Sequence, residues 1–149
     1  KVNCCKKAML PLAPYEDFSA FKMSLSDVGL MGAMSNVPAQ SLLDGNALFS
    51  DFKGALTEQY VLQQLLVKSS LSVYYWSSEN SRGELDFLLQ DEEKIIPVEV
   101  KAEENLQSKS LKTFVERNPG LHGVRFSMSP YREQDWLTNY PLYSLLAVL

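Results

Sequence analysis

Histidine and cysteine are scarce in this sequence, and their scarcity limits the kinds of site that the chain can build. The 149 residues include one histidine, His122, and two cysteines, Cys4 and Cys5, which are adjacent. Adjacent cysteines are poorly spaced for an ordinary disulfide, so we expect no disulfide scaffold and a reducing, cytoplasmic setting. His122 follows a turn, and we expect it to be a surface residue and not a ligand.

Long apolar runs and an excess of positive charge are also missing. The longest apolar run near an end of the chain, residues 142–149, is far too short to span a membrane, and no signal-peptide pattern occurs. We therefore expect no membrane partner. The 14 lysine and arginine residues against 18 aspartate and glutamate residues give a net charge of −4. This balance argues against a broadly basic nucleic-acid-binding surface, although it leaves a local basic groove open.

A phosphate-binding loop is the third absence. The motif G-x-x-x-x-G-K-[ST], which cradles ATP phosphates, does not occur, so this chain alone should not hydrolyse ATP. The first residue is a lysine, and we expect the N-terminus to be a cut in a longer protein. What is present is ordinary for a globular protein, because 46% hydrophobic and 21% charged residues suffice to bury one sizeable core.

The order of apolar and turn-forming segments predicts two regions. Residues 1–46 contain two short strand-like segments, a short helix over 28–34 and a loop over 36–46. They could hardly bury a core, so we expect the remnant of a preceding module and a linker. Residues 47–149 are expected to form one domain. Its predicted elements are a helix over 49–68, strands over 71–76, 85–89 and 95–101, a helix over 108–117, a strand over 124–128 and an apolar segment over 137–149. This order predicts an α/β fold with helices packed on a mixed sheet.

The stretch from Gly83 to Lys101 carries the strongest pattern. Side chains alternate between the two faces of a strand, so each of its two predicted strands has one apolar face and one face with ionisable groups. The apolar sets are Leu85, Phe87 and Leu89, and Ile96, Val98 and Val100; the opposite faces carry Glu84, Asp86 and Leu88, and Pro97, Glu99 and Lys101. A solvated edge would explain the charges, and an acidic site with a lysine beside it is the alternative.

A glutamate interrupts the apolar face of the first long predicted helix. At about 100° per residue, this face holds Ala55, Leu62, Leu65 and Leu66, and Glu58 falls among them. Burial of a carboxylate is costly unless the group is paired or bound to metal. Either Glu58 belongs to a site beneath the helix, or the apolar face is narrower and Glu58 lies at its wet border.

Four ionisable groups are therefore expected to converge: Glu58, Asp86, Glu99 and Lys101. Carboxylates clustered without histidine or cysteine favour a hard, oxygen-preferring cation such as Mg²⁺ or Mn²⁺. Such an ion can polarise a phosphodiester and activate a water, while a nearby lysine orients that water or neutralises developing charge. A lone E-x-K pattern is also common on ordinary surface strands. Glu84 shares a side with Asp86 and is interpreted as a solvated neighbour.

Two further features could contact nucleic acid. Lys109 and Lys112 begin the second predicted helix, where backbone N–H groups favour phosphate, although a solvated helix face is the simpler interpretation. Trp76, with Tyr74 and Tyr75, could stack on bases, but core packing of a central strand is the simpler interpretation.

The arrangement of a helix glutamate, a strand aspartate and E-x-K on the next strand resembles the PD-(D/E)xK nuclease superfamily. More closely, the chain resembles a family of uncharacterised domains that form the C-terminal part of bacterial and archaeal AAA-type P-loop ATPases. The strings that carry this resemblance are FKMSLSDVGLMGAM, FKGALTEQYVLQQLL, VYYW, GELDFLL, PVEVKAEENLQSKSLKTF and YPLYSLL.

This resemblance implies a restriction-endonuclease-like αβββαβ core and assigns roles to the four groups. Asp86 and Glu99 would be the metal ligands, Glu58 an additional, often water-mediated, ligand, and Lys101 the catalytic lysine. The proline of the superfamily's leading proline–aspartate pair is absent here, since Leu85 precedes Asp86.

The resemblance also implies partners. An ATPase domain would lie upstream in the same protein, bind ATP and form any oligomer, and residues 1–34 would be the remains of a winged-helix-like segment. The nuclease-like module would act on DNA or RNA. The alternative is a catalytically silent module that binds nucleic acid or protein and regulates the attached ATPase. A third hypothesis is a protein-interaction domain with no link to nucleic acid.

Overall fold

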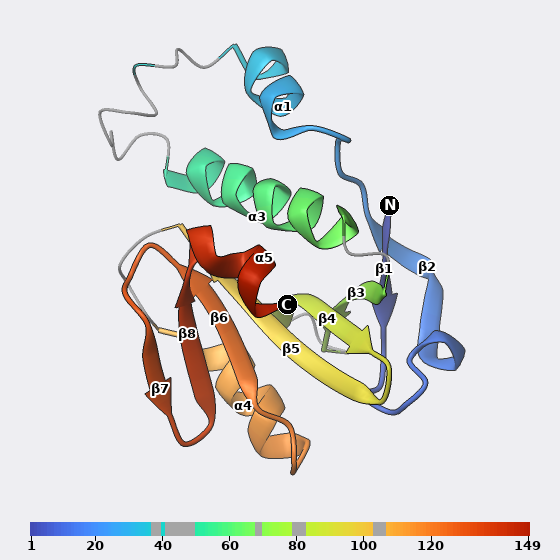
Figure 1. The fold of residues 1–149 in the computed structure, drawn as a ribbon. Helices are drawn as coiled ribbons and strands as arrows, with labels where there is room; N and C mark the ends of the chain where they lie inside the picture. Colours follow the sequence, from blue (N-terminus) through green and yellow to red (C-terminus); the bar gives the residue numbers. More distant parts are fainter. Residues whose placement is uncertain (37–39, 41–49, 68–69, 79–82, 103–106) are drawn as a thin grey trace.

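The structure is a computed structural model that describes residues 1–36, 40, 50–67, 70–78, 83–102 and 107–149. Figure 1 shows a twisted sheet with helices on both of its faces. The elements in chain order are β1 (Val2–Cys5), η1 (Ala13–Tyr15), β2 (Glu16–Lys22), α1 (Val28–Met34), α3 (Ser50–Val67), β3 (Leu71–Ser77), β4 (Glu84–Asp91), β5 (Lys94–Lys101), α4 (Lys109–Arg117), β6 (Gly123–Ser127), β7 (Arg132–Gln134), β8 (Leu137–Pro141), η3 (Leu142–Ser144) and α5 (Leu145–Val148).

Within the described residues, the strands form one eight-stranded sheet in the order β2-β1-β3-β4-β5-β6-β8-β7. β3, β4 and β5 are antiparallel neighbours, whereas β5, β6 and β8 run parallel. The predicted α/β class with a mixed sheet is confirmed, as is the helix–strand–strand–strand–helix–strand order from α3 to β6. No pattern in the sequence predicts β7, because a three-residue strand of charged and polar side chains has no apolar alternation.

The first two strands hydrogen-bond into the same sheet as the later ones. β1 lies between β2, to which it is antiparallel, and β3, to which it is parallel, with Asn3 opposite Tyr74. Val2 and Cys4 are buried in the core. The predicted domain boundary between residues 46 and 47 falls outside the described residues and stays a prediction.

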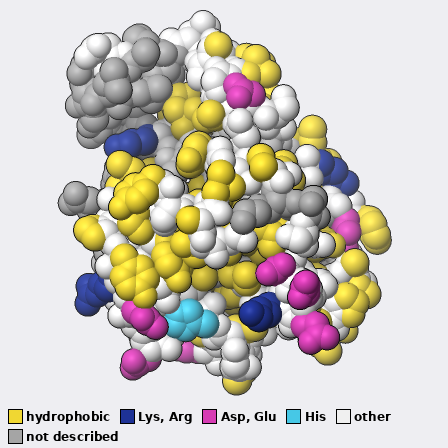
Figure 2. Space-filling view, viewed as in Figure 1, with side chains coloured by type: hydrophobic (Ala, Val, Ile, Leu, Met, Phe, Trp, Pro, Cys, Tyr) yellow, Lys and Arg dark blue, Asp and Glu magenta, His cyan; other side chains and the backbone are white. Residues whose placement is uncertain are grey.

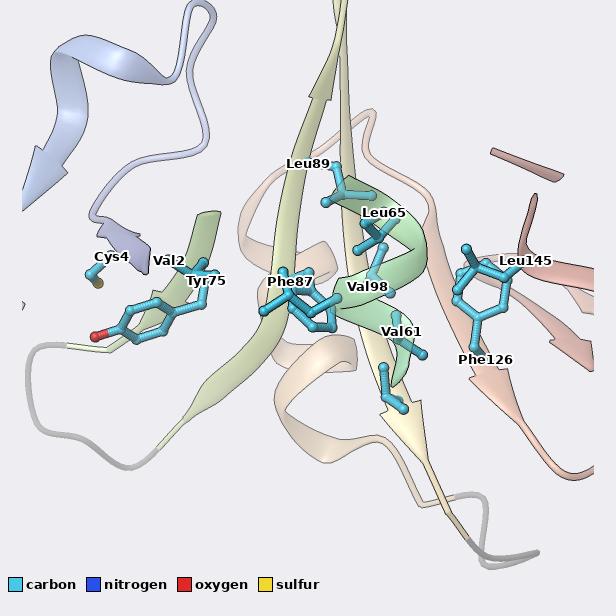
Figure 3. Packing of buried hydrophobic residues seen from close by; sticks show 12 residues of the cluster. Val2, Cys4, Val61, Leu65, Tyr75, Phe87, Leu89, Val98, Phe126 and Leu145 are labelled. Atoms are coloured by element: carbon cyan, nitrogen blue, oxygen red, sulfur yellow. The ribbon is translucent and has the colours of Figure 1, made fainter. Parts of the chain in front are cut away.

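α3 packs on one face of the sheet, over its central strands. Figure 3 shows Val61 and Leu65 of this helix directed at Phe87, Leu89 and Val98. The remaining buried members of this cluster are Val2, Cys4, Leu62, Tyr75, Val100, Phe126 and Leu145. The prediction that Leu66 lies on the buried face is wrong, because the helix is rotated towards Val61. Leu66 is 65% exposed, whereas Val61 is fully buried.

α4 covers the opposite face of the sheet. Its apolar side chains Leu111, Phe114 and Val115 are buried, as the sequence predicts. They pack with Cys5, Leu12, Leu85, Leu88 and Leu137. Trp76 of β3 meets Phe114 edge to face, with 4.8 Å between the ring centroids. Trp76 therefore packs on the core, which agrees with the simpler of its two interpretations.

Figure 2 shows hydrophobic side chains spread over one face of the molecule, with charged side chains in smaller groups around them. Large hydrophobic residues are exposed near both ends of the described chain, at Phe18 on β2 and at Tyr143 in η3. No helix in the described part of the chain combines the length and the apolarity that crossing a membrane requires.

Candidate functional site

An irregularity in the pairing of β3 with β4 decides where Asp86 points. β4 has one residue more than β3 between two successive pairings, so Asp86 and Phe87 both stand opposite Tyr75. Such a bulge bends a strand and re-aims a side chain. Asp86 and Phe87 therefore line the same cavity, whereas Leu85 packs on the α4 face. The prediction that Leu85 shares a face with Phe87 is wrong, because strict alternation stops at the bulge.

Asp86 lies just beyond Phe87, at the end of the region where β4 pairs with β5. Its Oδ2 accepts a hydrogen bond from the backbone N–H of Val100, with 2.7 Å between the two atoms. Burial, followed by the negative charge of Glu58, raises the pKa of Asp86 to about 7; the Val100 N–H opposes this rise and Glu99 adds to it. Near neutral pH this carboxyl therefore carries only part of a negative charge, and a nearby cation would increase that part.

Glu58 reaches the same place from α3. It is half-buried and lines one cavity together with Asp86, so it is not confined to the wet border of the helix. Burial raises the pKa of Glu58. The positive charges of Lys22 and Lys101 oppose that rise, and the negative charge of Glu84 adds to it. The predicted helix glutamate is thus brought to the predicted strand aspartate.

Glu99 and Lys101 form an ion pair on β5. Lys101 Nζ lies 2.8 Å from Glu99 Oε1, and the Glu99 side chain is only 9% exposed. The second oxygen, Glu99 Oε2, is buried and has no hydrogen-bond partner among the described residues. As predicted, Val98 and Val100 belong to the core beneath α3. Alternation therefore turns Glu99 and Lys101 to the α4 face of β5, and neither residue lines the cavity that holds Glu58 and Asp86.

Arg125 of β6 is a buried cation next to Glu99. It stands opposite Glu99 in the parallel pairing and is 2% exposed. Its Nε donates to Asn139 Oδ1 at 2.8 Å, and its Nη1 donates to Ser108 Oγ at 3.1 Å. Burial lowers the pKa of Arg125, and the charge of Glu99 raises it. Sequence reasoning misses Arg125, because only the pairing of β5 with β6 places it beside the site.

Lys22, the last residue of β2, is another cation that sequence reasoning misses. Its Nζ forms an ion pair with Glu84 and lies 5.0 Å from the centroid of the Tyr75 ring. Its positive charge opposes the raised pKa of both Glu58 and Asp86. The lysine stands in the string FKMSLSD, so the resemblance marks the segment but gives this side chain no role.

A cavity of about 330 Å³ joins Lys22, Glu58 and Asp86, whereas Glu99, Lys101 and Arg125 do not line it. Its polar lining consists of Lys22, Ser24, Glu58, Gln59 and Asp86. Its apolar lining consists of Val2, Met23, Leu25, Met31, Ala55, Leu62 and Phe87. The cavity thus has an acidic side with one lysine, and a larger apolar side.

The segment between β2 and α1 forms one wall of this cavity, and two glutamines of α3 hold it in place. Gln59 is buried; its Oε1 accepts from the Leu25 N–H at 3.1 Å, and its Nε2 donates to the Leu25 carbonyl at 2.7 Å. Gln63 Oε1 accepts from the Val28 N–H at 3.0 Å. These bonds satisfy backbone groups between β2 and α1, and they fix that segment against the helix that carries Glu58.

The donors at this site suit a hard divalent cation held by few protein ligands. Asp86 is repelled by its carboxylate neighbours, and the buried Glu99 Oε2 has no partner among the described residues, so a cation would relieve both conditions. Among the residues that the structure describes, no three Asp, Glu, His or Cys side chains are grouped closely enough to hold one ion. Mg²⁺ commonly uses one or two carboxylates and keeps several waters, so a site with fewer than three protein ligands could still bind it.

Lys109 and Lys112 are not brought to the cavity that Glu58 and Asp86 line. They lie on α4, which covers the opposite face of the sheet from α3 (Figure 1). Both are exposed, and Lys112 Nζ lies 4.0 Å from Glu116 Oε1. Lys109 borders a separate cavity of about 220 Å³, whose other lining residues are Trp76, Ser78, Gly83, Ser110, Thr113 and Arg117.

Comparison with protein-family models gives one match. The model described as "Domain of unknown function (DUF4143)" matches residues 53–145, which is more than half of the chain. The match includes Glu58, Asp86, Glu99 and Lys101, and it begins after Lys22. Comparisons with curated proteins and with solved structures give no significant match.

Proposed function

This chain belongs to the family described as Domain of unknown function (DUF4143), and we propose that its site hydrolyses phosphodiester bonds of DNA or RNA with a divalent cation, Mg²⁺ or Mn²⁺. One observation carries the proposal. Glu58 and Asp86 line a cavity from two different elements. Lys101 lies within electrostatic range of Glu58, and Glu99, its ion-pair partner, lies within electrostatic range of Asp86. A cluster of carboxylates with a lysine is the set that this chemistry needs.

Each residue of the cluster has a proposed role. Asp86 and Glu99 would hold the cation, and Glu58 would contribute through a bound water. The cation, when bound, supplies polarisation of the phosphate and a lowered pKa for water. The Val100 N–H fixes Asp86 Oδ2, which keeps this carboxylate oriented before any ligand arrives. Lys101 would orient the attacking water or neutralise charge on the phosphoryl oxygens.

The proposed reaction is a simple hydrolysis. A water oxygen bonds to phosphorus, and the bond from phosphorus to one sugar oxygen breaks. The water gives up a proton, and the departing sugar oxygen takes one up, so one product ends in a phosphate and the other in a hydroxyl. Positioning and electrostatic stabilisation account for such catalysis without covalent chemistry from the protein.

The proposed setting is a cytoplasmic protein in which an AAA-type ATPase domain precedes this module. The support for it is the resemblance carried by the strings FKMSLSD and PVEVKAEENLQSKSLKTF. ATP hydrolysis and assembly into oligomers would then belong to the preceding domain.

The test is a cleavage assay with end-labelled DNA and RNA, single-stranded and duplex, in Mn²⁺ or Mg²⁺. We expect cleavage by the native chain and a loss of at least roughly 100-fold in Asp86→Ala and Lys101→Ala. Glu116→Gln is the control, because Glu116 is exposed on α4 and pairs with Lys112. No cleavage by the native chain in Mn²⁺, or full cleavage by Lys101→Ala, would contradict the proposal.

A second candidate is a catalytically silent module that binds nucleic acid or protein and regulates the attached ATPase. It is favoured by the 2.8 Å contact that engages Glu99 Oε1 with Lys101, and by the acidic balance of the whole chain. This candidate predicts oligonucleotide binding or Mn²⁺ binding in calorimetry without any cleavage. Cleavage that Lys101→Ala abolishes would exclude it.

A further inference from the structure

One positively charged side chain at the site, Lys22, comes from outside the region that matches the family model. Lys22 lies on β2, whereas the family match begins at residue 53. We propose that Lys22 binds the phosphate of an unpaired nucleotide that occupies the cavity beside Glu58 and Asp86. The inference rests on the proposed function in one respect, since it takes a nucleic-acid strand as the ligand.

The cavity has the size and the two-sided lining that one nucleotide requires. Cavities that bind small ligands start at about 300 Å³, and this cavity, at about 330 Å³, suits a single unit and not a duplex. Met23, Leu25 and Phe87 offer an apolar surface to a base or sugar. An unpaired nucleotide placed there would lie directly against Glu58 and Asp86, two of the carboxylates proposed for hydrolysis.

Lys22 supplies the charge that this cavity otherwise lacks for an anionic ligand. It is the one cation in the lining formed by described residues, and the other two charged members are Glu58 and Asp86. A phosphate would be repelled by these carboxylates unless a positive group faced it. The lysine ammonium is a compact charge that binds phosphate from several directions.

The present partner of Lys22 is one that a phosphate can replace. The Lys22 and Glu84 side chains are 33% and 49% exposed, and ion pairs exposed to this degree contribute little to stability. The Lys22 ammonium has a second contact, because its Nζ lies 5.0 Å from the Tyr75 ring centroid and Tyr75 is buried. Lys22 can therefore leave Glu84 without losing its place beside the cavity.

A purely structural role for Lys22 gives a different expectation. If the ion pair served only to join β2 to β4, removal of either partner would have the same effect on every property. If Lys22 binds phosphate, removal of Glu84 releases the lysine and removes a repelling charge, so the two variants must affect ligand affinity in opposite directions.

The experiment measures binding of an end-labelled single-stranded oligonucleotide to the whole chain by fluorescence anisotropy, in EDTA and separately in Ca²⁺. We expect Lys22→Met to raise the Kd by about 10-fold, Lys22→Arg to stay near the native value, and Glu84→Gln to lower the Kd. Lys6→Met is the matched control, because Lys6 also pairs with a carboxylate, Asp17, at 3.0 Å, but does not line the cavity. Thermal melting confirms that each variant is folded.

Several results would overturn the proposal. These are an unchanged Kd in folded Lys22→Met, equal weakening by Lys22→Met and Glu84→Gln, duplex that binds as tightly as single strand, or equal competition by polyglutamate. Because binding in EDTA does not depend on cleavage, the two proposals fail separately. A chain that never cleaves but shows opposite effects of Lys22→Met and Glu84→Gln would retain the Lys22 site and lose the nuclease function.

Discussion

At the scale of single residues, Asp86 links the site to the stability of the fold. Its carboxyl keeps a proton up to about pH 7 in the folded chain, whereas a solvated aspartate loses it at about pH 4. The groups that face it are Glu58 from α3, Glu99 from β5 and Lys22 from β2. Between these two pH values the folded state holds a proton that the unfolded state has lost, so stability falls as pH rises through this window.

Replacing Asp86 should remove this pH dependence. In EDTA, we expect the free energy of unfolding of the native chain to be lower at about pH 8 than at about pH 5, with at most about 3 kcal/mol of the difference due to Asp86. Asp86→Asn keeps a neutral side chain and an oxygen for the Val100 N–H, so its urea unfolding should change much less over the same range. A native chain whose stability rises with pH over this range would contradict the assignment.

The identities of the site residues could be predicted from the sequence better than their surroundings. Glu58, Asp86, Glu99 and Lys101 stand out because helical and strand periodicity make an ionisable group conspicuous on an otherwise apolar pattern. Lys22 does not stand out, since it reaches the site through pairings far apart in the sequence. Neither the charge balance of the site nor the raised pKa of Asp86 can be inferred without those pairings.

At the scale of secondary-structure elements, the bulge in β4 is the feature that builds the cavity's acidic side. Without the additional residue, alternation would turn Asp86 away from Phe87 and from α3. Nothing in the string GELDFLL marks the bulge, because its one glycine, Gly83, precedes β4 and its apolar residues fit a regular strand equally well. The two strands were therefore predictable, whereas the position of Asp86 on the α3 face was not.

The hydrogen bonds of Gln59 give a test at the scale of an element. Gln59→Leu should lower the free energy of unfolding by about 1–3 kcal/mol, because it leaves the N–H and carbonyl of Leu25 without their partner. Gln64→Leu is the control on the same helix, since Gln64 makes no hydrogen bond to a side chain or loop among the described residues. Urea unfolding measures the change, and hydrogen exchange at the Leu25 amide should accelerate in Gln59→Leu alone. Equal effects of the two substitutions would show that the wall after β2 does not depend on Gln59.

At the scale of the whole molecule, the eight-stranded sheet contains strands from inside and from outside the region that matches the family model. β1 and β2 belong to the same sheet as the strands of the matched region, although both precede residue 53, the first matched residue, in the sequence. The helix and strand order of the later region could be predicted, because long apolar periods and turn residues are local signals. The position of β1 beside β3 could not, because parallel neighbours joined by a long connection leave no local pattern.

Removing the first part of the chain tests how far the later region stands alone. A chain that starts at residue 50 loses Val2 and Cys4 from the core and leaves β3 as an unpaired edge. We expect it to aggregate or to melt at a lower temperature than the whole chain, as measured by size-exclusion chromatography and circular dichroism. A stable monomer with unchanged melting would instead support the predicted domain boundary between residues 46 and 47.

The pairing of β1 with β3 also sets the order in which this protein can assemble. β3 is synthesised long after β1. Asn3 and Cys4 therefore cannot pair with Tyr74 and Tyr75 until that later part of the chain exists. Contacts between residues so far apart in sequence slow folding, because a long loop must close before the contact stabilises anything. The strand that delivers Lys22 to the cavity is built on β1, so the complete site is expected to form late, after the carboxylates on α3, β4 and β5 have already met.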